Sequence, residues 1–182
     1  MSKLSVFNFT TLNGFFKGPN DDTSWAHENP DNEYAAENLS PGGILLFGRV
    51  TYELMVKYWP TPAALKDAPA IAEGMNSAEK IVFSKTLDKA TWNRTRIVRD
   101  RIEDEVRKLK TAGKDMTILG SGSIVNQLAQ HGLIDEYQIM VHPVALGDGT
   151  PFLDGVRQKL NLKLVKTRAF KNGNVLLCYR PA

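Results

Sequence analysis

The segment Ile44–Glu53 constrains the fold of this chain more than any other. Its first four residues are all apolar, which is typical of a strand that is buried on both faces. Gly48 then permits a tight turn, and helix-compatible residues follow, with Val50, Leu54 and Tyr58 at four-residue spacing. The segment therefore predicts a short buried strand that turns directly into a helix.

The first turn of this predicted helix carries groups that suit a phosphate. Free backbone N–H groups and the positive end of the helix dipole lie there together with the guanidinium of Arg49 and the hydroxyl of Thr51. A helix that simply begins after a strand, with Arg49 in solvent, fits the same residues. Taken alone, the segment leaves both interpretations open.

The composition predicts one soluble globular domain that covers residues 1–182. Charged residues make up 24% of the chain and hydrophobic residues 42%, and the length allows a substantial core. The net charge of +3 is too small to indicate a nucleic-acid or membrane partner. Because Cys178 is the only cysteine and no signal peptide or membrane span is found, a reducing, cytoplasmic location is expected.

Strand and helix patterns alternate along the chain. Asp100–Glu103 is a capping-box pattern that predicts the start of a helix, and Lys171–Asn174 predicts the turn of a hairpin. Helices are expected at 33–39, 49–58, 68–76, 100–112 and 124–131, and strands at 4–12, 44–47, 80–83, 97–98, 116–119, 137–142, 162–170 and 175–179. This order favours an α/β fold with a mostly parallel sheet and a C-terminal antiparallel hairpin.

Three of the predicted strands end in residues that suit phosphate groups. These ends are Gly48–Thr51, Ser84–Lys85 and Gly120–Ser123. Ligands of open α/β sheets bind beyond the carboxyl ends of the strands, so three such ends indicate a large, multiply charged ligand such as a dinucleotide. The glycines at 120 and 122 form no Rossmann fingerprint, because Val125 stands where the third glycine belongs.

Residues that commonly bind metals or carry out hydrolysis form no pattern. The three histidines, His27, His131 and His142, are scattered without metal-ligand spacing, and no Gly-x-Ser-x-Gly motif is present. His142 precedes a proline and is interpreted as the end of a strand rather than as a base. We therefore expect no metal site.

The motifs occur in an order that resembles the dihydrofolate reductase superfamily. Nearly the whole chain takes part, and the matching motifs are Thr11–Phe15, Trp25, Gly48–Glu53, Val82–Leu87, Gly120–Ser123, Gly132–Glu136 and His142–Gly149. Within the superfamily, the chain is similar to the reductase domain of the bacterial riboflavin-biosynthesis deaminase–reductase, and more narrowly to the stand-alone bacterial proteins of that branch. The resemblance implies the three-layer dihydrofolate reductase-like fold.

The resemblance also implies that the chain binds NADPH. Arg49 and Thr51 would contact the phosphates at one helix start, and the turn at 120–124 would contact the pyrophosphate at the other. Ser84 and Lys85 would face the 2′-phosphate of the adenosine, with a simple polar strand end as the alternative. The expected cofactor-binding residues are Gly48, Arg49, Thr51, Ser84, Lys85, Gly120, Ser121, Gly122, Ser123 and Ile124.

For the substrate, the resemblance points to the loop after the first strand. The expected substrate-binding residues are Asn13, Gly14 and Trp25. True dihydrofolate reductases carry a carboxylate on the helix before the Gly-Arg-x-Thr motif, and Asn32 occupies that position here. Asp31 is therefore the candidate catalytic residue, with capping of the helix as its alternative role.

The implied activity is the NADPH-dependent reduction of a pyrimidine- or pterin-like heterocycle, most similar to that of 5-amino-6-(5-phosphoribosylamino)uracil reductase in riboflavin biosynthesis. Two alternatives stay open: a nucleotide-binding module of the same fold without catalysis, and dihydrofolate reduction. The terminal strands Leu162–Phe170 and Val175–Tyr179 expose an edge that invites pairing, so a homodimer is expected.

Overall fold

The computed structural model of the chain describes residues 2–27, 34 and 42–182, and none of the helices in these ranges is long and apolar enough to cross a membrane. The strands are β1 (Leu4–Thr11), β2 (Phe15–Lys17), β3 (Ile44–Gly48), β4 (Glu79–Phe83), β5 (Thr95–Val98), β6 (Met116–Leu119), β7 (Glu136–His142), β8 (Thr150–Pro151), β9 (Leu162–Ala169) and β10 (Val175–Pro181). The α-helices are α2 (Arg49–Tyr58), α3 (Pro62–Asp67), α4 (Pro69–Ser77), α5 (Ile102–Thr111) and α6 (Gly122–Gln130), and the 3-10 helices are η1 (Pro19–Asp21) and η2 (Ser24–Ala26).

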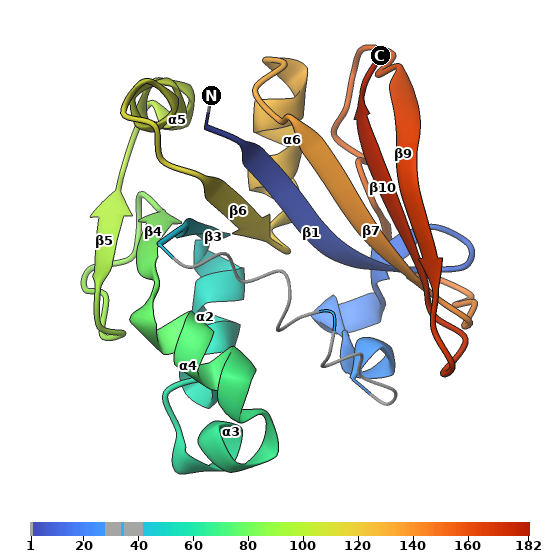
Figure 1. Cartoon of the computed structure of the whole chain (residues 1–182), viewed down its shortest axis with the longest axis horizontal. Helices are drawn as coiled ribbons and strands as arrows, with labels where there is room; N and C mark the ends of the chain where they lie inside the picture. Colours follow the sequence, from blue (N-terminus) through green and yellow to red (C-terminus); the bar gives the residue numbers. More distant parts are fainter. Residues whose placement is uncertain (1, 28–33, 35–41) are drawn as a thin grey trace.

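An eight-stranded sheet in the order β5-β4-β3-β6-β1-β7-β10-β9 forms the centre of the molecule (Figure 1). The strands from β5 to β7 in this order pair in parallel, whereas β10 is antiparallel to both β7 and β9. The prediction of a mostly parallel sheet with a C-terminal antiparallel pair is confirmed. Because parallel strands run in one direction, the carboxyl ends of β4, β3, β6, β1 and β7 all lie at one edge of the sheet.

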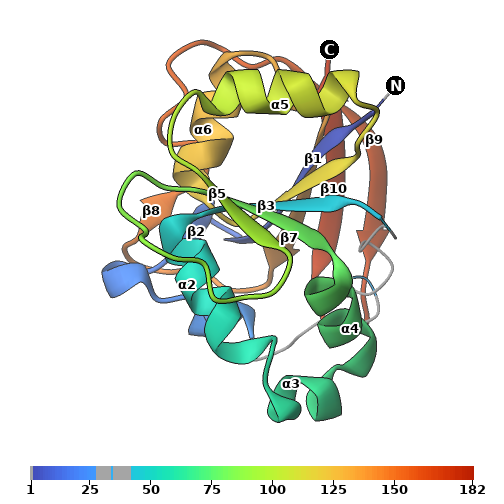
Figure 2. The ribbon, with the colours of Figure 1, turned by 90° about the vertical axis from the view of Figure 1, so that its left-hand side faces the viewer.

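Helices cover both faces of the sheet, which makes three layers. Figure 2 shows α5 and α6 on one side of the strands and α2 and α4 on the other. Successive residues of a strand point to opposite faces, so Leu46 packs with Val106 of α5 and Leu128 of α6. Its neighbour Phe47 packs with Tyr52 of α2 and with the end of α4. The buried strand before Gly48 is therefore covered on both sides, as the apolar run predicts.

The helix after Gly48 forms where it is predicted, but its regularly spaced apolar residues do not face the core. Val50, Leu54 and Tyr58 are 52%, 51% and 40% exposed. The buried side of α2 is marked instead by Tyr52, whose hydroxyl accepts hydrogen bonds from the backbone N–H groups of Thr91 (2.9 Å) and Trp92 (3.0 Å). The four-residue spacing therefore predicted the helix correctly but not its buried side, because Tyr52, two positions from both Val50 and Leu54, provides the core contact.

The capping box predicted at Asp100 is wrong. Arg101 adopts the left-handed conformation with φ of 56°, and α5 begins only at Ile102, without a side-chain cap. The carboxylate of Asp100 lies instead 3.5 Å from the ammonium of Lys85. The left-handed residue turns the chain before the helix, and this turn moves Asp100 away from the first helical N–H groups.

The C-terminal hairpin turns at the predicted residues. The N–H of Gly173 donates to the carbonyl of Phe170 (3.0 Å), and the N–H of Phe170 donates to the carbonyl of Asn174 (2.9 Å). Gly173 has φ of 90°, a conformation that favours glycine. The hairpin makes β9 the outermost strand of the sheet, and its Leu164 and Val165 are 47% and 44% exposed.

Candidate active site

The three strand ends that were expected to bind phosphate lie next to one another. β4, β3 and β6 are neighbours in the sheet and run parallel, so Ser84–Lys85, Gly48–Thr51 and Gly120–Ser123 follow their carboxyl ends at the same edge. This is the edge at which open α/β sheets bind their ligands. The sheet order thus brings together segments that are up to 75 residues apart in the sequence (Gly48 to Ser123, 123 − 48 = 75).

A direct hydrogen bond joins the starts of α2 and α6. The backbone N–H of Gly48 donates to Ser121 Oγ at 2.8 Å. A Cβ atom on Gly120, which has φ of 61°, would lie 3.3 Å from Thr51 Cγ2, so the second turn approaches the first turn of α2 closely. Two helix N-termini therefore begin side by side, and their dipoles add positive potential at one place.

Two residues of the second turn have structural roles that the sequence did not reveal. Ser121 is buried, and its hydroxyl bridges to Gly48 and, at 3.4 Å, to the carbonyl of Leu119, so it holds the two turns together. At Gly122 a Cβ atom would lie only 2.7 Å from Cζ of Phe16, which packs against the start of α6. A side chain at this position would therefore have to displace the Phe16 ring.

Several cations surround the outer part of this edge. Arg49 is about half exposed, and its guanidinium lies 3.7 Å from the Glu53 carboxylate. Lys85 is 79% exposed at its side chain and faces Asp100. Arg99, which follows β5, donates to the Lys85 carbonyl at 3.2 Å and was not among the predicted residues. The signal that could have identified Arg99 is its place just after the strand beside β4.

Ser84 is engaged in its own turn. Its hydroxyl oxygen accepts hydrogen bonds from the backbone N–H groups of Leu87 (2.9 Å) and Thr86 (3.2 Å). The hydroxyl therefore fixes the loop that carries Lys85. It keeps its own proton available for donation to an acceptor.

The loop after β1 is held in place by Asn13. Its amide donates to the carbonyl of Leu146 (2.7 Å) and its oxygen accepts from the N–H of Leu146 (3.2 Å) and from the Thr11 hydroxyl (2.8 Å). Gly14 follows with φ of 88° and an exposed backbone. The structure therefore gives Asn13 a clear role in clamping two loops together, and it gives Gly14 a turn role.

β1 extends past the end of its neighbour β6. Only Leu4–Phe7 pair with β6, whereas Ser5–Thr11 pair with β7 on the other side. The last bond toward β6 runs from the N–H of Gly120 to the Phe7 carbonyl (3.3 Å). Beyond it, no strand in the described parts of the chain pairs with this side of β1, beside the turn at Gly120.

A buried aromatic cluster lies at the carboxyl ends of β1 and β7. The ring centroid of His142 is 5.4 Å from that of Trp25 and 5.2 Å from that of Phe9, both in edge-to-face orientation. His142 is 2% and Trp25 6% exposed, and neither His142 Nε2 nor Trp25 Nε1 has a hydrogen-bond partner. Burial, and then the nearby His27, lower the pKa of the His142 imidazole, so it is neutral at pH 7.

His142 ends β7, as the sequence predicted. It also occupies the last inward position of that strand, in line with Met140, which the strand-end interpretation alone did not show. The candidate catalytic Asp31, together with Asn32, lies outside the described residues. Within the ranges that the structure describes, no group of three or more His, Cys, Asp or Glu side chains is arranged to hold a metal.

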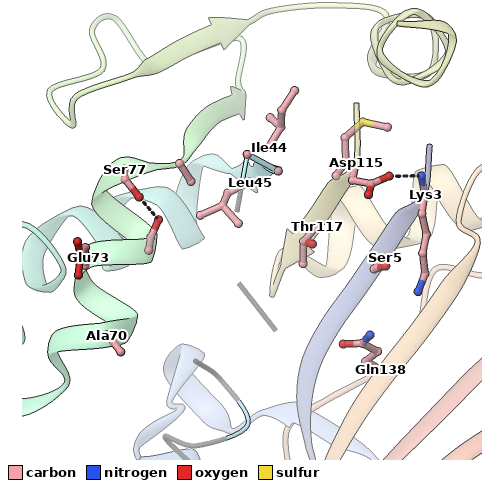
Figure 3. Close-up of a pocket in the computed structure, with 15 residues that line it drawn as sticks. Lys3, Ser5, Ile44, Leu45, Ala70, Glu73, Ser77, Asp115, Thr117 and Gln138 are labelled. Atoms are coloured by element: carbon pink, nitrogen blue, oxygen red, sulfur yellow. Dashed lines mark hydrogen bonds between the residues drawn. The ribbon is translucent and has the colours of Figure 1, made fainter. Parts of the chain in front are cut away.

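A separate cavity of about 390 Å³ lies at the opposite, amino-terminal ends of the strands (Figure 3). Its walls include Ile44 and Met116 at the starts of β3 and β6, Ser5 of β1, and Glu73 of α4. None of the predicted site residues that the structure describes lines this cavity. It is therefore distinct from the edge where the strand ends converge.

Solved structures of several bacterial proteins share this fold. A protein described as a candidate for riboflavin biosynthesis from Shewanella sp. PV-4 matches with a TM-score of 0.76 and 19% identity over 99% of both chains. A diaminohydroxyphosphoribosylaminopyrimidine deaminase/5-amino-6-(5-phosphoribosylamino)uracil reductase from Thermotoga maritima matches with a TM-score of 0.69 and 15% identity, over all of this chain and 57% of that one. A pyrimidine reductase-like protein from Corynebacterium diphtheriae gives a TM-score of 0.69 and 12% identity, over all of this chain and 92% of that one.

Sequence comparisons identify the family directly. The uncharacterized protein YyaP of Bacillus subtilis (strain 168) is 34% identical over 170 residues, which cover 93% of this chain and 89% of that protein. The family model described as the RibD C-terminal domain matches residues 2–176. The chain therefore belongs to the RibD C-terminal domain family.

Proposed function

We propose that this chain is an NADPH-dependent reductase of a pyrimidine- or pterin-like heterocycle, most similar to 5-amino-6-(5-phosphoribosylamino)uracil reductase. The observation that carries the proposal is the hydrogen bond between Gly48 N–H and Ser121 Oγ, which holds the starts of α2 and α6 side by side. Two adjacent helix N-termini offer several free N–H groups and positive potential to one ligand. A diphosphate fits this arrangement better than a single phosphate does.

The first turns would bind the diphosphate through backbone N–H groups, assisted by two side chains. Arg49 is tied only loosely to Glu53, at 3.7 Å on the surface, so its guanidinium is free to turn toward a phosphate. The Thr51 side chain lies against the turn at Gly120 and can donate its hydroxyl proton there. Gly48 and Gly120 leave room for the close approach of the two turns.

The cations beyond β4 and β5 favour NADPH over NADH. Lys85 and Arg99 contribute two positive charges and Asp100 one negative charge, so the net charge of this group is +1 (2 − 1). A 2′-phosphate gains charge-assisted hydrogen bonds there, whereas the 2′-hydroxyl of NADH does not. Ser84 holds the loop that presents Lys85, so its role is to position the lysine.

The open side of β1 suits the nicotinamide. Bound NADPH would supply the hydride, and the chain has to hold the ring in a fixed orientation. The Phe7 carbonyl points toward β6, so in a pleated strand the carbonyl of Phe9, two residues later, points to the same side. That carbonyl would accept a hydrogen bond from a carboxamide and so orient the ring beside the buried aromatic cluster.

The comparisons support a reductase of this class at the level of family and fold. A neighbour in the same fold is a 5-amino-6-(5-phosphoribosylamino)uracil reductase, and another is pyrimidine reductase-like. The substrate assigned to the present chain rests on this likeness. Its NADPH dependence rests on the paired helix starts and the cations.

Calorimetric titration with NADPH and NADH tests the cofactor. We expect NADPH to bind more tightly, and Lys85→Ala and Arg99→Ala each to weaken NADPH roughly fivefold to tenfold without changing NADH, since exposed charges are partly screened. Lys163→Ala, which removes one exposed lysine from the distant strand β9, is the matched control and should change neither. Equal affinities of the parent protein for the two cofactors would contradict the proposal.

Turnover separates an enzyme from a binding module of the same fold. Loss of NADPH absorbance is followed with aminouracils, their ribityl derivatives and dihydropterins as substrates. Oxidation of NADPH that depends on one of them supports the reductase. Tight NADPH binding without turnover of any member of the panel supports a nucleotide-binding module.

A further inference from the structure

We propose that Trp25 and His142 bind the polar edge of the substrate heterocycle, an inference that rests on the proposed reductase function. Trp25 Nε1 and His142 Nε2 are both buried and both lack a hydrogen-bond partner. Buried polar atoms are nearly always paired in folded proteins, because an unpaired one loses its hydrogen bonds to water without replacement. Two unpaired nitrogens on rings in contact are therefore best explained by a ligand that pairs with them.

The position of the two rings agrees with a substrate site. His142 is the last residue of β7 and is paired in register with Thr11, the last residue of β1. The cluster therefore lies at the carboxyl edge of the sheet, where β1 and β7 end side by side. The nicotinamide would lie at the opposite side of β1, which faces β6. The rings of Phe9 and Trp25, both in contact with His142, give this part of the edge apolar surroundings that suit a flat heterocycle.

The hydrogen-bonding properties of the two nitrogens also define which substrate heterocycle they can bind. An indole N–H only donates, so Trp25 needs an acceptor such as a carbonyl oxygen or an unprotonated ring nitrogen. A neutral imidazole nitrogen either donates or accepts, depending on its tautomer, so His142 can pair with the neighbouring group on the ring. A uracil or pterin presents a carbonyl oxygen next to an N–H, and this pair of groups satisfies both residues.

The three tryptophans make this inference directly measurable. Trp92 Nε1 donates to Asn76 Oδ1 at 2.7 Å, and Trp59 Nε1 donates to Met55 Sδ at 3.0 Å, so Trp25 alone carries a free indole N–H. In a protein labelled with [15N]tryptophan, the three indole N–H signals resolve separately. Trp25→Phe assigns the signal of interest.

The experiment adds 5,6-diaminouracil, uracil or pterin to the labelled protein, with and without NADP+. We expect the Trp25 signal to move downfield as its N–H gains an acceptor, while the signals of Trp92 and Trp59 stay in place. Trp25→Phe and His142→Phe keep an aromatic ring and remove the nitrogen, so each should weaken the heterocycle about tenfold. Trp59→Phe is the matched control and should leave binding unchanged.

Two results overturn the inference. The first is a heterocycle that binds without moving the Trp25 signal, since it must then bind to other residues. The second is the failure of all three heterocycles to bind at millimolar concentration, since the proposed class of ligand is then wrong. The measurement on the parent protein needs no variant to fold. Failure of the proposed cofactor assignment is a different outcome. In that case NADP+ does not bind, while the heterocycle added alone still shifts the Trp25 signal.

Discussion

Lys80 provides the sharpest test of the energetics of this fold. Its side chain is only 1% exposed, and Nζ donates to the carbonyls of Ala78 (2.7 Å), Met75 (2.8 Å) and Asn76 (3.3 Å) at the end of α4. The ammonium also lies 4.6 Å from the centre of the Trp92 ring. Burial, and then the positive charge of Arg94, lower the pKa of Lys80 to about 8.

The depressed pKa makes stability depend on pH in a defined direction. With a pKa of about 8 in the folded state and the usual 10.5 in the unfolded state, the unfolded chain holds the extra proton between these values. The contribution of Lys80 to the free energy of unfolding is therefore fully present above pH 10.5 and is lost as the pH falls to 8. The whole change is about 3.4 kcal/mol, of which about 1.6 kcal/mol lies between pH 8 and 9.5.

Lys80→Met removes this dependence while it keeps a long apolar side chain. Urea unfolding followed by circular dichroism at several pH values between 7.5 and 9.5 gives the free energy of unfolding of the parent and the variant. We expect the parent to gain about 1.6 kcal/mol relative to the variant between pH 8 and 9.5. Lys163→Met controls for the loss of one exposed lysine.

The reasoning about Lys80 has a clear point of failure. Three carbonyl acceptors and an aromatic face all favour the charged ammonium, and they oppose the cost of burial. A difference between parent and variant that stays flat from pH 8 to 9.5 means that these contacts fully offset the burial. A slope of the opposite sign means that they exceed it.

Two further predictions concern packing and assembly. Gly122→Ala should lower the free energy of unfolding by about 1–3 kcal/mol, because its Cβ would meet the Phe16 ring. Gly147→Ala is the control, since open space surrounds Gly147 and the free energy of unfolding should change little; urea unfolding measures both variants. The chain should behave as a dimer in light scattering, and Leu164→Lys on the exposed outer strand β9 should yield monomers. A monomer mass for the parent protein at micromolar concentration rules out the dimer.

The sequence predicted those parts of the molecule that depend on local pattern and on topology. The apolar run before Gly48 indicated a buried strand, and the alternation of strands and helices favoured parallel pairing. Once the strands are parallel, their carboxyl ends must share one edge. The meeting of Gly48–Thr51 with Gly120–Ser123 follows from that geometry, although no pattern gives the order of the strands.

The sequence could not predict features that arise from contacts between distant residues. The residues at 100–103 are all of the right type for a capping box, but Arg101 adopts the left-handed conformation and the cap does not form. Lys80 lies near the start of β4, and its ammonium is buried because it donates to carbonyls at the end of α4. The isolation of His142 Nε2 depends on Trp25 and Phe9, which come from the opposite end of the chain.

The glycines of the two turns illustrate why function has to be tested elsewhere in the site. Gly120 and Gly122 each approach another side chain so closely that a substitution would disturb the packing whether or not a phosphate binds there. A loss of activity in such a variant would therefore not distinguish a binding role from a structural one. Lys85 is different, because its side chain is largely exposed and we expect its removal to leave the fold intact. Trp25 is informative for another reason, since the signal of its indole N–H reports on the ligand in the unaltered protein.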